Sequence, residues 1–150
     1  MQQEIIFPKK EIPFEVPSGI CVQYAEGFDE INEKTVRKII KNVRKGTFQH
    51  LYLALDPDGE SSFFQMVRQN GYAALAIGIE TCVDNCVKWT SYLSYNSRYA
   101  ASDEVSPIRY DQDIFLKKYT IQDSDAVSKC VEWFIRTGTP YPGIDWAKPF

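Results

Sequence analysis

Long apolar runs are missing from this sequence of 150 residues. No stretch approaches the roughly 20 apolar residues that cross a membrane. The apolar stretch 5–7 follows the acidic start Met1-Gln-Gln-Glu4, and it is too short for the core of a signal peptide. Of the four cysteines only Cys82 and Cys86 are close in sequence. We therefore expect a cytoplasmic protein with reduced thiols and no membrane contact, in which a three-residue turn over 83–85 brings Cys82 and Cys86 near each other.

Catalytic motifs are missing as well. The chain has one histidine, His50, and no residue at motif spacing to orient it, so we expect its ring to bond to the backbone at the start of a strand. No nucleophile elbow, Gly-rich phosphate loop, His-Glu-x-x-His or Cys-x-x-Cys pattern occurs. The acidic turn 56–60 lacks the spacing of a calcium loop. The sequence predicts no catalytic residues, no cofactor and no metal site.

Basic side chains are outnumbered by acidic ones except in one segment. The net charge is −3, whereas a domain that binds nucleic acid usually carries a clear positive excess. Residues 34–45 nevertheless hold six basic side chains and no acidic one, which leaves −9 on the rest of the chain. This segment has two interpretations: a patch that binds phosphates or an acidic partner, or the solvated face of a helix.

Two amphipathic helices are predicted, at about 32–45 and 124–137. Val36, Ile39, Ile40 and Val43 recur at the helical spacing i, i+3, i+4, i+7, and a second stripe does the same. The second stripe consists of Val127, Cys130, Val131 and Phe134. Asn32 and either Asp123 or Ser124 are suited to cap the first turns, and Gly46 and Gly138 to end the helices.

The remaining patterns are those of strands. Hairpins are expected over 48–68 and 72–95, a short strand at 20–24, an exposed loop at 96–107, and one or two strands over 108–121. Residues 1–19 contain three prolines and predict an edge strand or extended arm. The fold predicted for 1–150 is a single α+β domain: an antiparallel, twisted sheet of five to seven strands with helices mainly on one face. Ala74, Ala76 and Gly78 alternate with bulky residues and predict a flat, partly free opposite face.

The C-terminal stretch 122–146 carries a family resemblance. Its amphipathic helix ends in Phe-Ile-Arg-Thr-Gly, a Pro-containing turn follows, and Ile144-Asp-Trp146 closes the stretch. This resembles the first-numbered family of immunity proteins of bacterial polymorphic toxin systems, of the contact-dependent inhibition or type VI secretion kind. The resemblance implies a mostly β protein with a helix near each end, which neutralises a cognate toxin domain such as a deaminase or nuclease by covering its active site.

For such an inhibitor, acidic side chains and a few tyrosines are the candidate contacts, because carboxylates can occupy phosphate positions in a basic toxin cleft. These candidates are Asp56, Asp58, Glu60, Asp84, Tyr92, Tyr99, Asp103, Glu104, Tyr110, Asp111 and Asp113. We expect a monomer or weak dimer whose three tryptophans serve packing. The alternative function is a small enzyme or ligand-binding domain with a pocket lined by aromatics such as Phe63, Trp89 and Tyr95.

Overall fold

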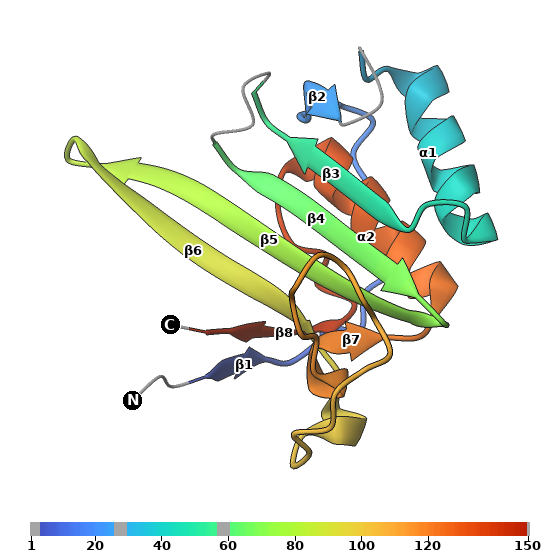
Figure 1. The fold of residues 1–150 in the computed structure, drawn as a ribbon. Coiled ribbons are helices and arrows are strands. Elements are labelled where there is room, and N and C mark those ends of the chain that lie inside the picture. Colours follow the sequence, from blue (N-terminus) through green and yellow to red (C-terminus); the bar gives the residue numbers. More distant parts are fainter. Residues whose placement is uncertain (1–3, 26–29, 57–60, 150) are drawn as a thin grey trace.

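The computed structural model of the chain describes residues 4–25, 30–56 and 61–149. In this part the chain forms an antiparallel sheet with two long helices on one face, which confirms the predicted α+β class (Figure 1). The strands are β1 (Ile5–Phe7), β2 (Tyr24–Ala25), β3 (His50–Ala54), β4 (Phe63–Gln69), β5 (Tyr72–Val83), β6 (Cys86–Tyr95), β7 (Thr120–Ile121) and β8 (Asp145–Lys148). The helices are α1 (Glu33–Lys45) and α2 (Ser124–Thr137), with short 3-10 turns η1 (Ser97–Tyr99) and η2 (Lys117–Tyr119).

Both helices begin and end where their capping residues predict. The side chain of Asn32 accepts a hydrogen bond from the Thr35 N–H, and Asp123 accepts from the first turn of α2. Gly46 and Gly138 adopt φ of 74° and 71°, the left-handed conformation that ends a helix without a side-chain clash. The helix predictions are thereby confirmed to within one residue.

Seven strands follow one another in the order β1-β8-β6-β5-β4-β3-β2, and β7 pairs with β5 outside this path. The hairpins β3–β4 and β5–β6 confirm the two predicted hairpins. The apolar stripes of both helices pack against Leu51, Leu53, Phe64, Leu75 and Ile77, which lie on one face of the sheet and form the core. We call the opposite surface the open face.

The described part of the Pro-rich arm consists of an edge strand and an extended stretch, which we call the strap. β1 is an edge strand beside β8, and the chain then crosses α2 toward β2. The N–H groups of Cys21 and Val22 donate to the carbonyl of Ile135, at 2.9 and 3.2 Å. Phe14 packs edge-on against Tyr141, with ring centroids 5.6 Å apart. The strap therefore fixes the C-terminal part of α2 from outside.

Two strand predictions are wrong. The strand expected at 20–24 is reduced to the two residues of β2, because the backbone of 21–22 bonds to α2. The strands expected over 108–121 are replaced by isolated bridges, η2 and the two-residue β7. Together with the loop predicted at 96–107, this stretch forms one excursion over the open face, residues 96–119, which we call the roof segment (Figure 1).

Candidate functional site

The open face is flat at its centre because β5 presents small side chains there. The register sets Ala74 beside Val67 of β4, and Ala76 between Gln65 of β4 and Leu93 of β6. Side chains alternate between the faces of a strand, so these five share the open face, whereas Leu75 and Ile77 belong to the core. The flat surface predicted at Ala74 and Ala76 is confirmed and forms the floor of a site, whereas the third small residue, Gly78, is covered by the ring of Phe63.

The roof segment is held above this floor by a few specific contacts. Ile108 is fully buried and packs with Val67 and Ala74, with Tyr110 and Phe115 against the same cluster. The side-chain carbonyl of Gln69 accepts a hydrogen bond of 2.6 Å from the Arg109 N–H. The Ser94 hydroxyl donates to the carbonyl of Tyr119 at 2.8 Å. The sheet thus positions the segment through both apolar and polar anchors.

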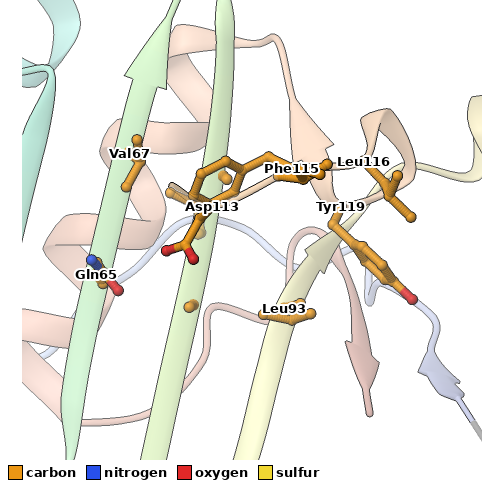
Figure 2. Close-up of a pocket in the computed structure, with 11 residues that line it drawn as sticks. Gln65, Val67, Leu93, Asp113, Phe115, Leu116 and Tyr119 are labelled. Carbon is orange, nitrogen blue, oxygen red and sulfur yellow. The ribbon is translucent and has the colours of Figure 1, made fainter. Parts of the chain in front are cut away.

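A pocket of about 370 Å³ lies between floor and roof (Figure 2). Its walls are Gln65, Val67, Ala74, Leu75, Ala76, Leu93, Asp113, Ile114, Phe115, Leu116 and Tyr119. Most of these side chains are apolar, and Gln65, Asp113 and the tyrosine contribute the polar groups. Figure 2 shows the carboxylate of Asp113 pointing from the roof toward the side of the pocket where Gln65 lies. The pocket therefore suits an apolar group with a polar or basic end.

His50 lies beside this polar side. Its ring stacks on Tyr110, with centroids 4.7 Å apart and planes 12° from parallel. Its Nε2 atom is 3.3 Å from Nε2 of Gln65. These two contacts are made by side chains, and the backbone bond expected from the sequence stays a prediction. The stack positions Tyr110, and through it the turn that carries Asp113.

An aromatic row crosses the open face next to the pocket. Phe63 stacks on Tyr52, with ring centroids 5.7 Å apart, and lies 6.4 Å from the ring of Trp89. The phenyl ring occupies the space above Gly78, where a Cβ atom would lie 2.4 Å from it. Trp89 remains 50% exposed, and its neighbour on the same face, Val87, is 57% exposed. The prediction that all three tryptophans serve packing is therefore wrong for Trp89, which lies on the protruding β5–β6 ribbon.

The predicted pocket of Phe63, Trp89 and Tyr95 is also corrected. None of the three lines the apolar pocket, because Phe63 of β4 and Trp89 of β6 lie farther along the sheet, toward the tip of the ribbon. Tyr95 lies 6.5 Å, between ring centroids, from Tyr119. The sequence missed the real pocket because its roof comes from a segment without strand or helix periodicity. Its one local signal was the run of small residues in β5.

The acidic candidates lie in separate places. Asp58 and Glu60 fall outside the described residues, Asp56 follows β3, and Asp84 is at the tip of the β5–β6 ribbon. Glu104 pairs with Lys117 at 2.5 Å and raises the pKa of that lysine, chiefly through the side-chain hydrogen bond. Asp103 lies 3.8 Å from Lys118. The turn at 110–113 leaves Asp111 and Asp113 exposed, and Asp113 lines the pocket.

The three candidate tyrosines are all half-buried. Tyr92 faces the helix side of the sheet and contacts Phe7, with ring centroids 6.2 Å apart. Tyr99 has Lys117 Nζ 5.6 Å from its ring centre. Tyr110 belongs to the stack with His50. Of the three, Tyr110 is the one beside the pocket.

The basic segment forms the outer side of α1. Arg37, Lys41, Arg44 and Lys45 surround a groove of about 460 Å³ between the two helices, with Ile40 in its wall. Arg44 lies 3.7 Å from Asp125, and its Nε donates to the Ser128 hydroxyl at 3.3 Å. This groove is on the helix side of the sheet, away from the apolar pocket.

The tip of the β5–β6 ribbon corrects the cysteine prediction. Val83 pairs directly with Cys86, so the turn has two residues, Asp84 and Asn85, instead of three. Cys82 pairs with Val87 on the open face, and Cys86 lies on the other face. Because their side chains point to opposite faces, the two thiols are not positioned for a disulfide with each other.

The fold and site define an α+β protein whose sheet is covered by helices on one face and carries an apolar pocket on the other. Comparison with protein-family models, characterised proteins and solved structures finds no match for the chain. No helix in the described ranges is long and apolar enough to cross a membrane. Across the described part of the chain, no group of three or more His, Cys, Asp or Glu side chains could hold a metal ion.

Proposed function

We propose that this chain is a cytoplasmic immunity protein that binds a cognate bacterial toxin domain and neutralises it by covering its active site. The resemblance of 122–146 to immunity proteins supports this, since these residues form α2, the turn after it and the start of β8. The observation that carries the proposal is the exposed aromatic row beside an open apolar pocket. Trp89 is 50% exposed, and tryptophan is enriched among the residues that anchor protein interfaces.

Charge supports the same surface. Asp113 is exposed in the wall of the pocket and Asp111 is exposed in the same turn, whereas Asp103 and Glu104 are paired with lysines. A toxin that acts on nucleic acid carries a basic cleft, and two exposed carboxylates next to aromatic anchors can enter such a cleft. In this proposal the open face supplies the affinity and the two aspartates orient the toxin. The basic groove beside α1 faces away from the complex.

Two valines of the β5–β6 ribbon test whether the toxin binds to the open face. Val87 and Val83 are exposed to 57% and 52%, but they lie on opposite faces of the same ribbon. We expect Val87→Asp and Trp89→Ala each to weaken the toxin complex by about 30-fold or more, because a charge or a missing anchor disrupts a desolvated contact. Val83→Asp should change the affinity less than about threefold. Titration calorimetry with the toxin domain encoded beside the gene measures all three.

Growth of cells that co-express this toxin is the second readout. Cells with the wild-type chain or Val83→Asp should grow, and cells with Val87→Asp should be poisoned. Equal protection by all variants would rule out the open face as the surface that contacts the toxin. Absence of any complex with the wild-type chain would defeat the immunity function itself.

A small-ligand-binding protein is the second candidate function. The pocket volume of about 370 Å³ falls in the range that holds small molecules, and the roof segment encloses it. The position that separates the two functions is Ala76, which is half-buried in the floor between Gln65 and Leu93. A larger side chain there fills the pocket without touching the core.

For Ala76→Leu we expect unchanged thermal stability and a toxin complex weakened by about tenfold, because an anchor of the toxin loses its pocket. The melting temperature and the dissociation constant of the variant are the measurements. A ligand-binding protein would behave differently: small apolar amines would stabilise the wild type and not Ala76→Leu, and the toxin would not bind either protein.

A further inference from the structure

The outer half of the β5–β6 ribbon has an open edge. β8 pairs with β6 only from Leu93 to Tyr95. Over Cys86–Tyr92, the side of β6 away from β5 has no strand beside it among the residues that the structure describes. Figure 1 shows this ribbon extending well past the ends of β8 and β1. Seven residues are enough for a complete additional strand.

The turn determines which backbone groups point outward. Asp84 and Asn85 have φ of 52° and 62°, as in a two-residue hairpin turn, and in such a hairpin the flanking pair exchanges both hydrogen bonds. Cys86 therefore bonds to Val83, and the next residues alternate. The N–H and C=O groups that point away from β5 belong to Val87, Trp89 and Ser91.

Two contacts agree with this alternation of the backbone groups that point toward β5 and away from it. Leu93, the next residue in the series, is the first that pairs with β8. On the opposite edge Glu80, which pairs with Trp89, donates its N–H to the Ser62 hydroxyl at 2.9 Å. Ser62 thus satisfies one outward N–H group of β5, that of Glu80. Natural edge strands are commonly protected by prolines, bulges or charges, and the β6 edge carries Lys88 as its one charged residue.

We propose that the β6 edge at Val87, Trp89 and Ser91 pairs with an extended strand of the toxin. This strand would lie beside the outer half of β6, where β8 does not reach. This inference rests on the proposed function and names the way in which the partner binds. Backbone donors and acceptors that repeat every second residue are matched by another extended polypeptide. On the open face, apolar side chains of that strand would lie against Val87 and Trp89.

Charge favours a foreign strand over a second copy of this chain. If β6 paired with its own copy over all seven residues, the two Lys88 side chains would be diagonal neighbours on the same face, which is unfavourable. Lys88 pairs with Thr81 on the helix side of the sheet. The matching strand would therefore carry an acidic side chain at that position.

Amide hydrogen exchange measured by NMR tests the proposal. In the free protein the amides of Val87, Trp89 and Ser91 should exchange rapidly, and those of Lys88, Thr90 and Tyr92, which bond to β5, should be protected. Addition of the toxin domain should slow exchange at the first three by about tenfold or more, as new strand hydrogen bonds form. A complex that leaves these three amides fast would overturn strand addition and leave the immunity function intact. No complex would overturn both, and slowing that depends on the concentration of the free protein would assign the edge to a second copy.

A single proline substitution, with an alanine control at the same position, tests the edge by mutation. Ser91→Pro removes an N–H that points away from β5, so the ribbon keeps its own hydrogen bonds. We expect about tenfold weaker toxin binding for Ser91→Pro, and Ser91→Ala, which keeps the donor, should bind as the wild type does. Equal affinities of the two variants would contradict the proposal, and the exchange pattern of the wild type tests it if Ser91→Pro fails to fold.

Discussion

Replacing Phe134 by alanine is expected to lower the free energy of unfolding by about 3–5 kcal/mol, which is a large part of the stability of a domain of this size. Phe134 is fully buried at the contact of α2 with the sheet. Its ring lies 5.5 Å from that of Phe64, between centroids, so the truncation leaves a cavity between α2 and the sheet. Urea unfolding followed by circular dichroism measures the change.

Two variants calibrate this result. Phe134→Leu keeps most of the volume and should cost about 1–2 kcal/mol. Ile114→Ala removes an apolar side chain that is 73% exposed at the pocket rim, so its effect on unfolding should stay within about 0.5 kcal/mol. If Phe134→Ala were as stable as Ile114→Ala, the helix stripe would not be the centre of the core.

The elements that the sequence predicts well are those whose signals are local. The apolar stripe of each helix, its capping side chain and the glycine after it lie within about 15 residues, and each signal agrees with the others. Leu51 and Leu53 are buried and alternate with the half-buried His50 and Tyr52, so the hairpin of β3 and β4 follows from its pattern. Where propensity, periodicity and caps agree, tertiary packing does not change the outcome.

The roof segment was not predictable because its stability comes from distant partners. Ile108 is buried by Val67 and Ala74, about 40 positions earlier, and the Arg109 N–H bonds to Gln69. A window that contains residues 96–119 alone shows polar residues and imperfect alternation, which indicate a loop and then a strand. The small residues of β5 indicated a flat face, but the residues that cover it left no local signal.

The turn between β5 and β6 shows how sensitive a site can be to one residue. A three-residue turn would have placed Cys82 and Cys86 on the same side of the ribbon. The actual two-residue turn places the two cysteines on opposite faces. It also fixes the register in which the side chains of Val87 and Trp89 lie on the open face and their backbone groups point away from β5. Asn85 adopts the left-handed conformation that such a turn requires, which asparagine tolerates better than most residues.

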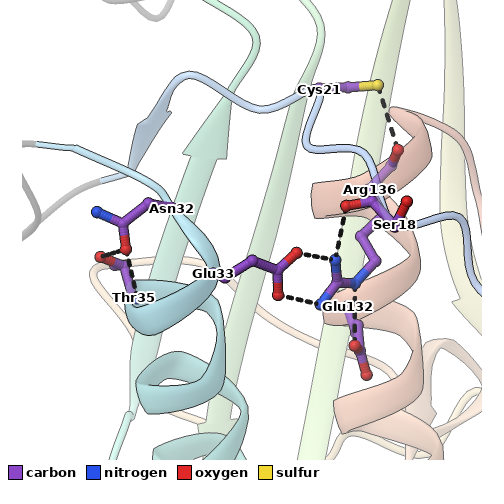
Figure 3. Close-up of polar contacts among 7 residues, drawn as sticks. All are labelled: Ser18, Cys21, Asn32, Glu33, Thr35, Glu132 and Arg136. Atoms are coloured by element: carbon purple, nitrogen blue, oxygen red, sulfur yellow. Dashed lines mark hydrogen bonds and ion pairs between the residues drawn. The ribbon is translucent and has the colours of Figure 1, made fainter.

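A buried arginine joins the two helices to the strap (Figure 3). The guanidinium of Arg136 is 9% exposed; it donates to both carboxylate oxygens of Glu33, at 2.6 and 3.0 Å, and to Glu132 at 3.0 Å. It also donates to the carbonyl of Ser18 at 3.3 Å. These hydrogen bonds raise the pKa of Arg136, so its charge persists at every pH at which the protein folds. One side chain therefore links α1, α2 and the N-terminal strap.

We expect Arg136→Ala to lower the free energy of unfolding by about 2–4 kcal/mol, since it leaves Glu33 and Glu132 without their cation and removes a packed side chain. Arg44 is the matched control: it also lies between α1 and α2, 3.7 Å from Asp125, but both side chains are 56% exposed. Arg44→Ala should cost about 0.5 kcal/mol or less. Equal losses for the two variants would show that burial does not distinguish them.

The pH dependence separates the ion pair from simple packing. The hydrogen bond from Arg136 holds the pKa of Glu33 below its ordinary value of 4.5. The folded state thus binds this proton less readily than the unfolded state, so the contribution of Glu33 is complete above pH 4.5 and is lost as the pH falls through the lowered pKa. In Arg136→Ala the carboxylate has no such partner. The difference in melting temperature between wild type and Arg136→Ala should therefore shrink as the pH is lowered below 4.5, and Glu33→Gln should remove most of that shrinkage. A difference that stayed constant with pH would mean that Arg136 stabilises the fold through packing alone.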